Sequence, residues 1–150
     1  TPGQLLEWTG GRAWVATGSP FDPVVWDGVE RVIGQANNLF VFPGVGLGLI
    51  VSGTNQATWE MFLEAARVLA DAVTPDRLAT GALYPPLADL RRVSTAVALR
   101  VARLGSDPEL SDGYLAQLLE RQQWFPDYEP YVAVGAGDLP LRNRGPATTF

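Results

Sequence analysis

The chain contains no lysine, no histidine and no cysteine in its 150 residues, so all eleven of its basic residues are arginines. These absences exclude a histidine general base, a lysine Schiff base, a cysteine nucleophile, thiolate metal sites and disulfide bonds. The lack of cysteine is compatible with either redox compartment.

Positive charge and long hydrophobic runs are also scarce. The formal net charge of −5 argues against a nucleic-acid partner, because phosphate binding requires clustered cations. The longest uncharged apolar stretch, residues 39–51, is too short to span a membrane. The first seven residues lack the basic lead and apolar core of a signal peptide. We therefore expect a soluble, cytoplasmic protein with no membrane partner. The first residue is not Met, which fits a piece of a longer protein at least as well as a mature chain.

The first third of the chain carries the signals of short strands and turns. Residues 13–17 are mostly apolar and too short for a helix, so they predict a buried strand that ends at Gly18. Asp27-Gly28 lies between two apolar runs, which predicts a β-hairpin. Residues 39–42 predict a second buried strand.

Capping residues and apolar periodicity predict several helices, most of them in the rest of the chain. The residues expected to cap helices are Thr1, Thr58 and Thr74. Glycines at 10 and 11 are expected to end the first helix. A stripe of apolar residues at helical spacing predicts a helix of about four turns; it comprises Leu90, Val93, Val97, Val101 and Leu104. Gly105 is expected to stop this helix, a last helix is expected around residues 110–123, and the prolines beyond residue 124 predict an extended tail.

This order of elements is typical of the C-terminal portion of a Rossmann-like α/β domain, with parallel strands, a β-hairpin and then several helices. In open α/β sheets, ligands bind outside the carboxyl ends of the strands. The loops after the two expected strands, residues 18–21 and 43–48, leave from such ends, whereas Asn37 precedes its strand. The expected geometry therefore favours a site near Gly18 and Gly44 over one at Asn37.

Asn37 and Asn38 form an adjacent pair of carboxamides whose role has two interpretations. A carboxamide both donates and accepts hydrogen bonds without charge, which suits a small ligand such as a hydroxy acid. Asparagine also closes turns with its own side chain. On spacing alone, the turn interpretation is favoured.

The glycines at 44, 46 and 48 have the spacing GxGxG, not the GxGxxG of a dinucleotide loop. We interpret them as allowing a helix start to pack closely against the sheet. The carboxylates Asp22, Asp27 and Glu30 could in principle hold Mg²⁺ or Mn²⁺. Because Asp22 and Asp27 lie in a loop and a turn, we interpret these residues as solvated and predict no metal ligand among them.

Three motifs occur in an order that closely resembles the C-terminal part of malic enzymes. They are ATGSPF at residues 16–21, GQANNLFVFPGVGLG at 34–48 and LYPPL at 83–87. The resemblance runs from about residue 5 to residue 131. It implies that residues 1–131 are the C-terminal part of the malic enzyme NAD-binding domain. Residues 132–150 show no such resemblance and are expected to form an extended tail.

The resemblance also implies a function, the oxidative decarboxylation of malate to pyruvate with NAD or NADP and with Mg²⁺ or Mn²⁺. It assigns Asn37 to the malate carboxylate, Asn38 to a supporting role, and Gly18 and Ser19 to the wall of the nicotinamide site. Tyr84 is interpreted as structural. The family's catalytic tyrosine, catalytic lysine and metal ligands fall outside this chain, so no catalytic residue is predicted here, and the chain alone should be inactive. Its partners would be the rest of the enzyme chain and further copies in a homo-oligomer.

Two other classes of function stay open at this point. One is a non-catalytic truncated paralogue, or interaction module, that binds full-length subunits through an apolar sheet edge. The other is a small-anion binding domain that uses the glycine-rich helix start.

Overall fold

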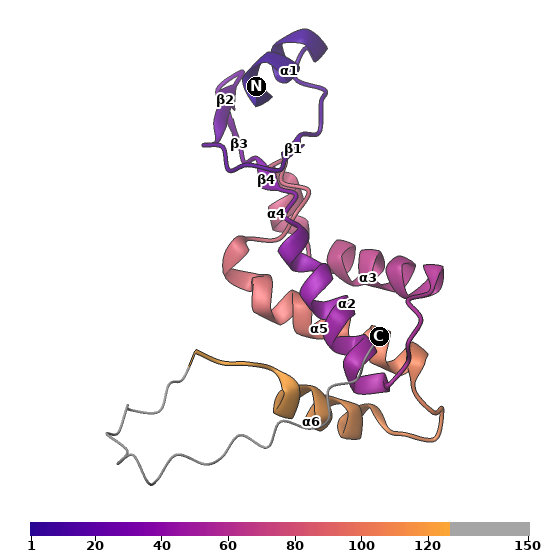
Figure 1. Ribbon diagram of the computed structural model, residues 1–150. Coiled ribbons are helices and arrows are strands. Elements are labelled where there is room, and N and C mark those ends of the chain that lie inside the picture. The colour runs from indigo at the N-terminus through magenta and orange to yellow at the C-terminus, as the bar shows by residue number, and fades with distance from the viewer. Residues whose placement is uncertain (127–150) are drawn as a thin grey trace, which may run out of the picture.

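The computed structural model describes residues 1–126. Figure 1 shows a small N-terminal lobe joined through short parallel strands to a layer of helices. In chain order the elements are α1 (Pro2–Thr9), β1 (Ala16–Thr17), β2 (Val24–Trp26), β3 (Val29–Arg31), β4 (Gly34–Gln35), η1 (Asn38–Phe40), α2 (Phe42–Ser52), α3 (Trp59–Asp71), α4 (Pro75–Ala79), η2 (Leu87–Asp89), α5 (Leu90–Gly105) and α6 (Asp112–Gln122). The predicted α/β class, with parallel strands, a hairpin and several helices, is confirmed.

The strands form two separate pairs. β1 and β4 are parallel, with Thr17 opposite Gln35, and the amide of Ala36 extends the pair by donating to the carbonyl oxygen of Thr17 at 2.9 Å. β2 and β3 are antiparallel and form the predicted hairpin. Asp27 and Gly28 at its turn have φ values of 50° and 72°, as a two-residue hairpin turn of this hand requires.

The prediction of a strand at residues 39–42 is wrong. Residues Asn38–Phe40 form the 3₁₀ turn η1, and α2 begins at Phe42 with Pro43 in its first turn, where proline costs no hydrogen bond. A short apolar run fits a buried strand and a buried helix equally well, and here the run continues as helix to Ser52. The parallel partner of β1 is instead the two-residue strand β4. The predicted first strand is also shorter than expected, since only Ala16–Thr17 pair.

The three predicted helix-capping threonines are confirmed. Thr1, Thr58 and Thr74 each accept a backbone hydrogen bond through the side chain and start α1, α3 and α4. Gly10, at φ 58°, ends α1. Gly105 is the last residue of α5 and not a stop beyond it, because the cap is Ser106 in an extended conformation.

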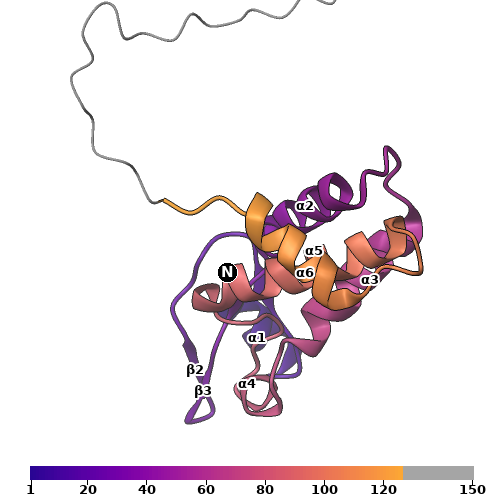
Figure 2. The ribbon, with the colours of Figure 1, turned by 90° about the horizontal axis from the view of Figure 1, so that it is seen from below.

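The helical core is centred on α5, which contacts α2, α3 and α6. Figure 2 shows these helices from below, with α3 and α6 close to α5. The predicted stripe of α5 supplies Val97 and Val101 to a core completed by Val45, Met61 and Ala65. Among the described residues no helix is long and apolar enough to cross a membrane. The expected tail at residues 132–150 lies outside the part of the chain that the structure describes.

Two glycines of α2 set the distance between α2 and α5. A Cβ at Gly44 would collide with the carbonyl oxygen of Ser94, and one at Gly48 would lie 2.7 Å from that of Ala98. Gly46 faces the other way, with no atom within 4 Å of its Cβ position. The predicted close packing at this helix start is real, but its partner is a helix and not the sheet.

Candidate functional site

The candidate site lies at the carboxyl ends of β1 and β4. Because these strands are parallel, the loops that follow them leave from the same edge. Gly18 and Ser19 follow β1, and Asn37 and Asn38 follow β4 after one residue. The sequence-based preference for Gly44 over Asn37 is therefore reversed, since Asn37 lies beyond a strand end and Gly44 is buried against α5.

A residue that the sequence analysis did not single out connects the two loops. The Nε2 of Gln35, at the end of β4, donates a hydrogen bond of 2.9 Å to the carbonyl oxygen of Gly18. Gln35 stands inside the 34–48 motif, but its partner is 17 positions away in the sequence. Only the parallel pairing of β1 with β4 reveals this contact.

Asn37 closes a turn with one end of its side chain. Its Oδ1 accepts a hydrogen bond of 2.9 Å from the amide of Leu39 and so caps η1. Because that partner is an N–H donor, the carboxamide orientation is determined, and Nδ2 is the free donor end. Within residues 1–126 this Nδ2 makes no hydrogen bond. The turn interpretation thus accounts for the oxygen of Asn37 and leaves its nitrogen for another acceptor. Asn38 beside it is exposed.

Gly18 and Ser19 form an open edge of the site. Thr17 Oγ1 donates to the carbonyl oxygen of Ser19 at 2.8 Å, which fixes the turn. Gly18 is exposed, its φ is not positive, and nothing lies within 4 Å of a Cβ placed on it. Neither backbone conformation nor packing within the described residues requires a glycine at this position. The absence of a side chain at Gly18 leaves space beside the loop for a bound ligand.

The third sequence motif, residues 83–87, packs against β4. A Cβ at Gly34 would lie 2.9 Å from the amide nitrogen of Tyr84, so β4 and residues 83–87 approach closely. The Tyr84 ring lies 6.5 Å from that of Phe40, and Arg77 Nε donates to the Tyr84 carbonyl oxygen at 3.0 Å. These contacts agree with a structural role for Tyr84.

All three motifs contribute to one cavity of about 240 Å³. Its lining includes Pro20 and Phe21 from the first motif, Gln35 from the second, and Pro85 and Pro86 from the third. Segments that are far apart in the sequence therefore meet at one place. The predicted residues Gly18, Ser19, Asn37 and Asn38 lie on the adjoining loops and not in the cavity wall.

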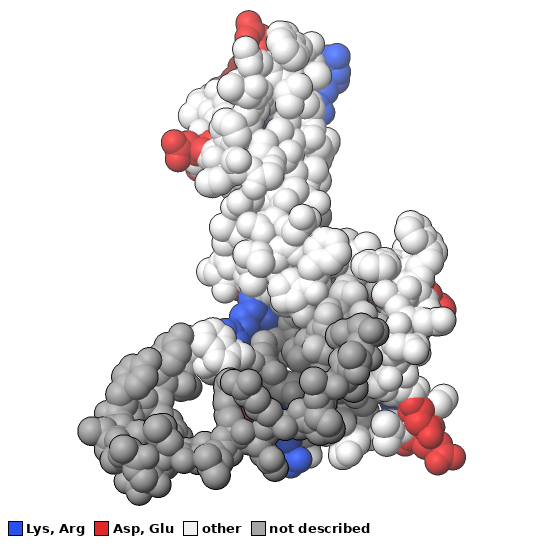
Figure 3. Space-filling model, viewed as in Figure 1, with Lys and Arg blue, Asp and Glu red and all other residues white. Residues whose placement is uncertain are grey.

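The groups at this edge are carboxamides, a hydroxyl and backbone atoms, all of them uncharged. In Figure 3 the narrow part directly below the N-terminal lobe is white on the visible face, and a blue patch lies where it meets the helices. Such groups suit the uncharged carboxamide of a nicotinamide ring and one carboxylate of a small acid. The described part of the chain holds no group of three His, Cys, Asp or Glu side chains placed to bind a metal ion. The residues present therefore fit a nicotinamide cofactor and do not by themselves fit a metal ion.

Parallel strands followed by loops at their carboxyl ends are typical of the open α/β class, in which ligands bind at those ends. A family model described as "Malic enzyme, NAD binding domain" matches residues 1–105. The chain is 41% identical to NAD-dependent malic enzyme 2 of Photobacterium profundum and 43% identical to the NAD-dependent malic enzyme of Aeromonas salmonicida. The chain belongs to the malic enzyme family, within its NAD-binding domain. Each alignment covers 87% of this chain and 24% of the relative, so the chain spans about a quarter of the length of these enzymes.

Proposed function

We propose that this chain is a segment of an NAD-dependent malic enzyme, here called the parent enzyme, which oxidises malate and decarboxylates it to pyruvate. The observation that carries the proposal is the hydrogen bond between Gln35 and Gly18, because it joins the malate loop and the nicotinamide loop at one edge. NAD is favoured over NADP because the relatives carry the name NAD-dependent malic enzyme.

In this proposal Asn37 binds a malate carboxylate through Nδ2. The bond from the Leu39 amide to Oδ1 supports that role, because it fixes the carboxamide with the donor end free. A hydrogen bond from an amide to a carboxylate contributes about 1.5–3 kcal/mol. Asn38 supports the same subsite.

Gly18 and Ser19 form part of the nicotinamide wall. The open space at Gly18 supports close approach of the ring, and the Ser19 hydroxyl is a donor and acceptor for its carboxamide. The cofactor supplies the hydride acceptor, and this chain contributes orientation. Gln35 positions the loop that carries Gly18.

The remaining catalytic groups come from elsewhere in the parent enzyme. These are the acid and base residues and the ligands of Mg²⁺ or Mn²⁺, which the family resemblance assigns outside this chain. On the same basis, residues 1–131 form the C-terminal part of the NAD-binding domain, and the parent enzyme is a homo-oligomer.

An apolar face on α2 supports docking of this segment onto the rest of the parent enzyme. Phe42 and Ile50 are 57% and 68% exposed. Each lies about one helical turn from Gly46, on the same face of α2. The small-anion alternative has no such support at the glycine-rich helix start, since Gly44 and Gly48 are occupied in packing against α5.

The direct test compares two purified proteins supplied with malate, NAD and Mn²⁺. The parent enzyme should generate NADH and pyruvate, and the 150-residue chain should generate neither. NADH formation by the chain alone, or none by the parent enzyme, would refute the proposal.

A further inference from the structure

Three successive carbonyl oxygens at the candidate site, those of Thr17, Gly18 and Ser19, each accept a hydrogen bond. The amide of Ala36 donates to the first at 2.9 Å, and Gln35 Nε2 donates to the second at 2.9 Å. The hydroxyl of Thr17 donates to the third at 2.8 Å. A carbonyl oxygen can only accept, so the direction of each bond is determined. The three peptide planes of this loop are therefore each held by a donor.

Both side-chain donors come from one cross-strand pair. Thr17 is the last residue of β1, and it lies opposite Gln35, the last residue of β4. Gln35 reaches across to the carbonyl oxygen of Gly18, whereas the hydroxyl of Thr17 reaches forward along its own chain to that of Ser19. The orientation of the Ser19 carbonyl therefore depends on Thr17 and not on Gln35.

Packing contributes little to the conformation of this loop within the described residues. Gly18 and Ser19 are exposed, and nothing lies within 4 Å of a Cβ placed on Gly18. Glycine samples more backbone conformations than any other residue, so an unrestrained loop at this point would populate several of them. Pro20 limits only the residue before it, Ser19, to extended conformations. The hydrogen bonds to the carbonyl oxygens are therefore the main restraint on Gly18 and Ser19.

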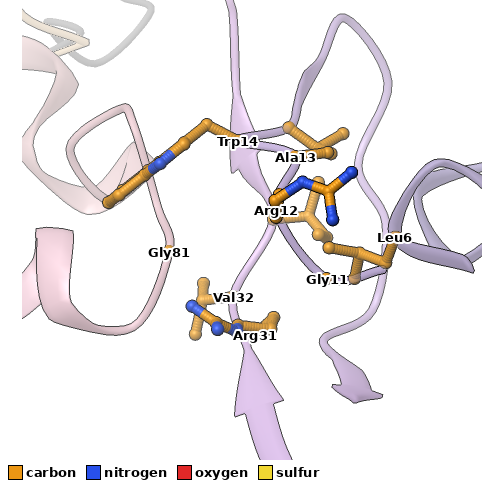
Figure 4. A pocket seen from close by; sticks show the side chains of 10 residues that line it. Leu6, Gly11, Arg12, Ala13, Trp14, Arg31, Val32 and Gly81 are labelled. Carbon is orange, nitrogen blue, oxygen red and sulfur yellow. The ribbon is translucent and has the colours of Figure 1, made fainter. Parts of the chain in front are cut away.

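The strand pair itself is held at its other end, by contacts that do not involve the loop. Residues 11–15 lead into β1 and residues 31–33 lead into β4, and together they line a pocket of about 280 Å³. The amide of Val32 donates to the carbonyl oxygen of Thr80 at 2.8 Å, and Figure 4 shows Val32 beside the Gly81 segment. Loss of one hydroxyl in the loop should therefore release the loop and leave the strand pair in place.

We propose that Thr17 is a positioning residue for the nicotinamide ring of the cofactor. The inference rests on the proposed function, in which Gly18 and Ser19 form part of the nicotinamide wall. A ligand binds only those molecules whose loop has the competent conformation, so its dissociation constant rises as that fraction falls. By holding the carbonyl oxygen of Ser19, the hydroxyl of Thr17 raises the competent fraction. Thr17 thus acts on the cofactor through Ser19 and touches no reacting atom.

Calorimetric titration of the parent enzyme with NAD and with ADP-ribose, which lacks the nicotinamide ring, tests this proposal. Thr17→Val keeps the shape of the side chain and removes its hydroxyl. One neutral hydrogen bond changes such an equilibrium about two- to tenfold, so Thr17→Val should weaken NAD by this factor and leave ADP-ribose unchanged. The KM for NAD should rise with it. Thr17→Ser keeps the hydroxyl and should bind both ligands as the wild type does.

Thr58→Val is the matched control, because it also removes a threonine hydroxyl that holds a backbone group, at the start of α3. It should lower the melting temperature and leave the affinity for NAD unchanged. Should Thr17→Val fail to fold, the comparison of Thr17→Ala with Thr17→Ser isolates the same hydroxyl.

Wild-type affinity for NAD in Thr17→Val, beside a weakened Gly18→Val, would overturn the role of Thr17 alone. Wild-type affinity in both variants would remove the whole loop from the nicotinamide site and would overturn it as well. An equal loss of affinity for NAD and ADP-ribose would show a general structural effect and would also contradict the proposal. Failure of the wild-type parent enzyme to form NADH from malate would instead refute the proposed function, and the titrations with NAD would still decide the role of Thr17.

Discussion

Gln35 Nε2 donates a hydrogen bond of 2.9 Å to the carbonyl oxygen of Gly18, so the last residue of β4 holds the loop that follows β1. One side chain thereby links the segment assigned to malate with the segment assigned to nicotinamide. Hydride transfer needs these two ligands in contact at a fixed separation, and misplacement by about 1 Å slows such a reaction.

We predict that Gln35→Glu in the parent enzyme lowers kcat/KM for malate about three- to tenfold. The substitution keeps the size of the side chain and removes the N–H donor, and a neutral hydrogen bond contributes about 0.5–1.5 kcal/mol. Steady-state kinetics with malate and with NAD, beside a thermal melt, measure the effect. If Gln35 has no positioning role, both kinetic constants will match those of the wild type.

Gly18→Val should raise the KM for NAD without unfolding the protein. The space at the Cβ position is open, so stability should change by no more than about 0.5 kcal/mol. A side chain pressed against the bound ring should cost about 1–3 kcal/mol, or roughly 5-fold to 150-fold in affinity.

Gly34→Ala is the contrasting variant for Gly18. Its Cβ would meet the backbone of Tyr84, so this substitution should lower the melting temperature whether or not NAD is present. Unchanged NAD affinity in Gly18→Val would remove Gly18 and Ser19 from the cofactor site.

Replacing the glycines of α2 by alanine should change the stability in opposite directions at Gly46 and at the two packed positions, Gly44 and Gly48. Gly46→Ala should stabilise the 150-residue chain by about 0.5–1 kcal/mol, because alanine favours the helix and meets no other atom. Gly44→Ala and Gly48→Ala should each destabilise it by about 1–3 kcal/mol by forcing α2 away from α5. Urea unfolding of the three variants gives the comparison. The same sign at all three positions would contradict the packing described for α2.

Local signals predicted the parts of the fold that depend on neighbouring residues. Asp27-Gly28 specified its hairpin through backbone conformation, and Thr58 specified the start of α3 through its side-chain oxygen. The wrong strand at residues 39–42 shows the limit of such signals, since a short apolar run has no distinguishing period. β4 was missed because Gly34 and Gln35 have little β propensity and pair only through a partner far away in the sequence.

The candidate site was predictable only in part for the same reason. The family resemblance singled out Asn37 and Gly18, and the structure brings their loops to one edge. The bond from Gln35 to Gly18 and the close approach of Gly34 to Tyr84 depend on contacts between distant segments. Neither contact leaves a pattern in the local sequence.

Asn37→Asp in the parent enzyme tests the central claim most directly. Aspartate keeps an oxygen for the Leu39 amide, so the cap of η1 and the melting temperature should be preserved. It also removes the Nδ2 donor and sets a negative charge against the malate carboxylate. We therefore predict that kcat/KM for malate falls about tenfold or more, with the KM for NAD little changed.

Asn55→Asp, at an exposed position in the loop before α3, is the matched control and should behave as the wild type. The decisive measurement is kcat/KM for malate in the Asn37→Asp and Asn55→Asp enzymes, taken beside their melting temperatures. A large loss confined to Asn37→Asp, at unchanged melting temperature, is the result that the malate-binding role predicts. Wild-type kinetics in Asn37→Asp, at unchanged melting temperature, would show that Asn37 only closes a turn and would contradict that role.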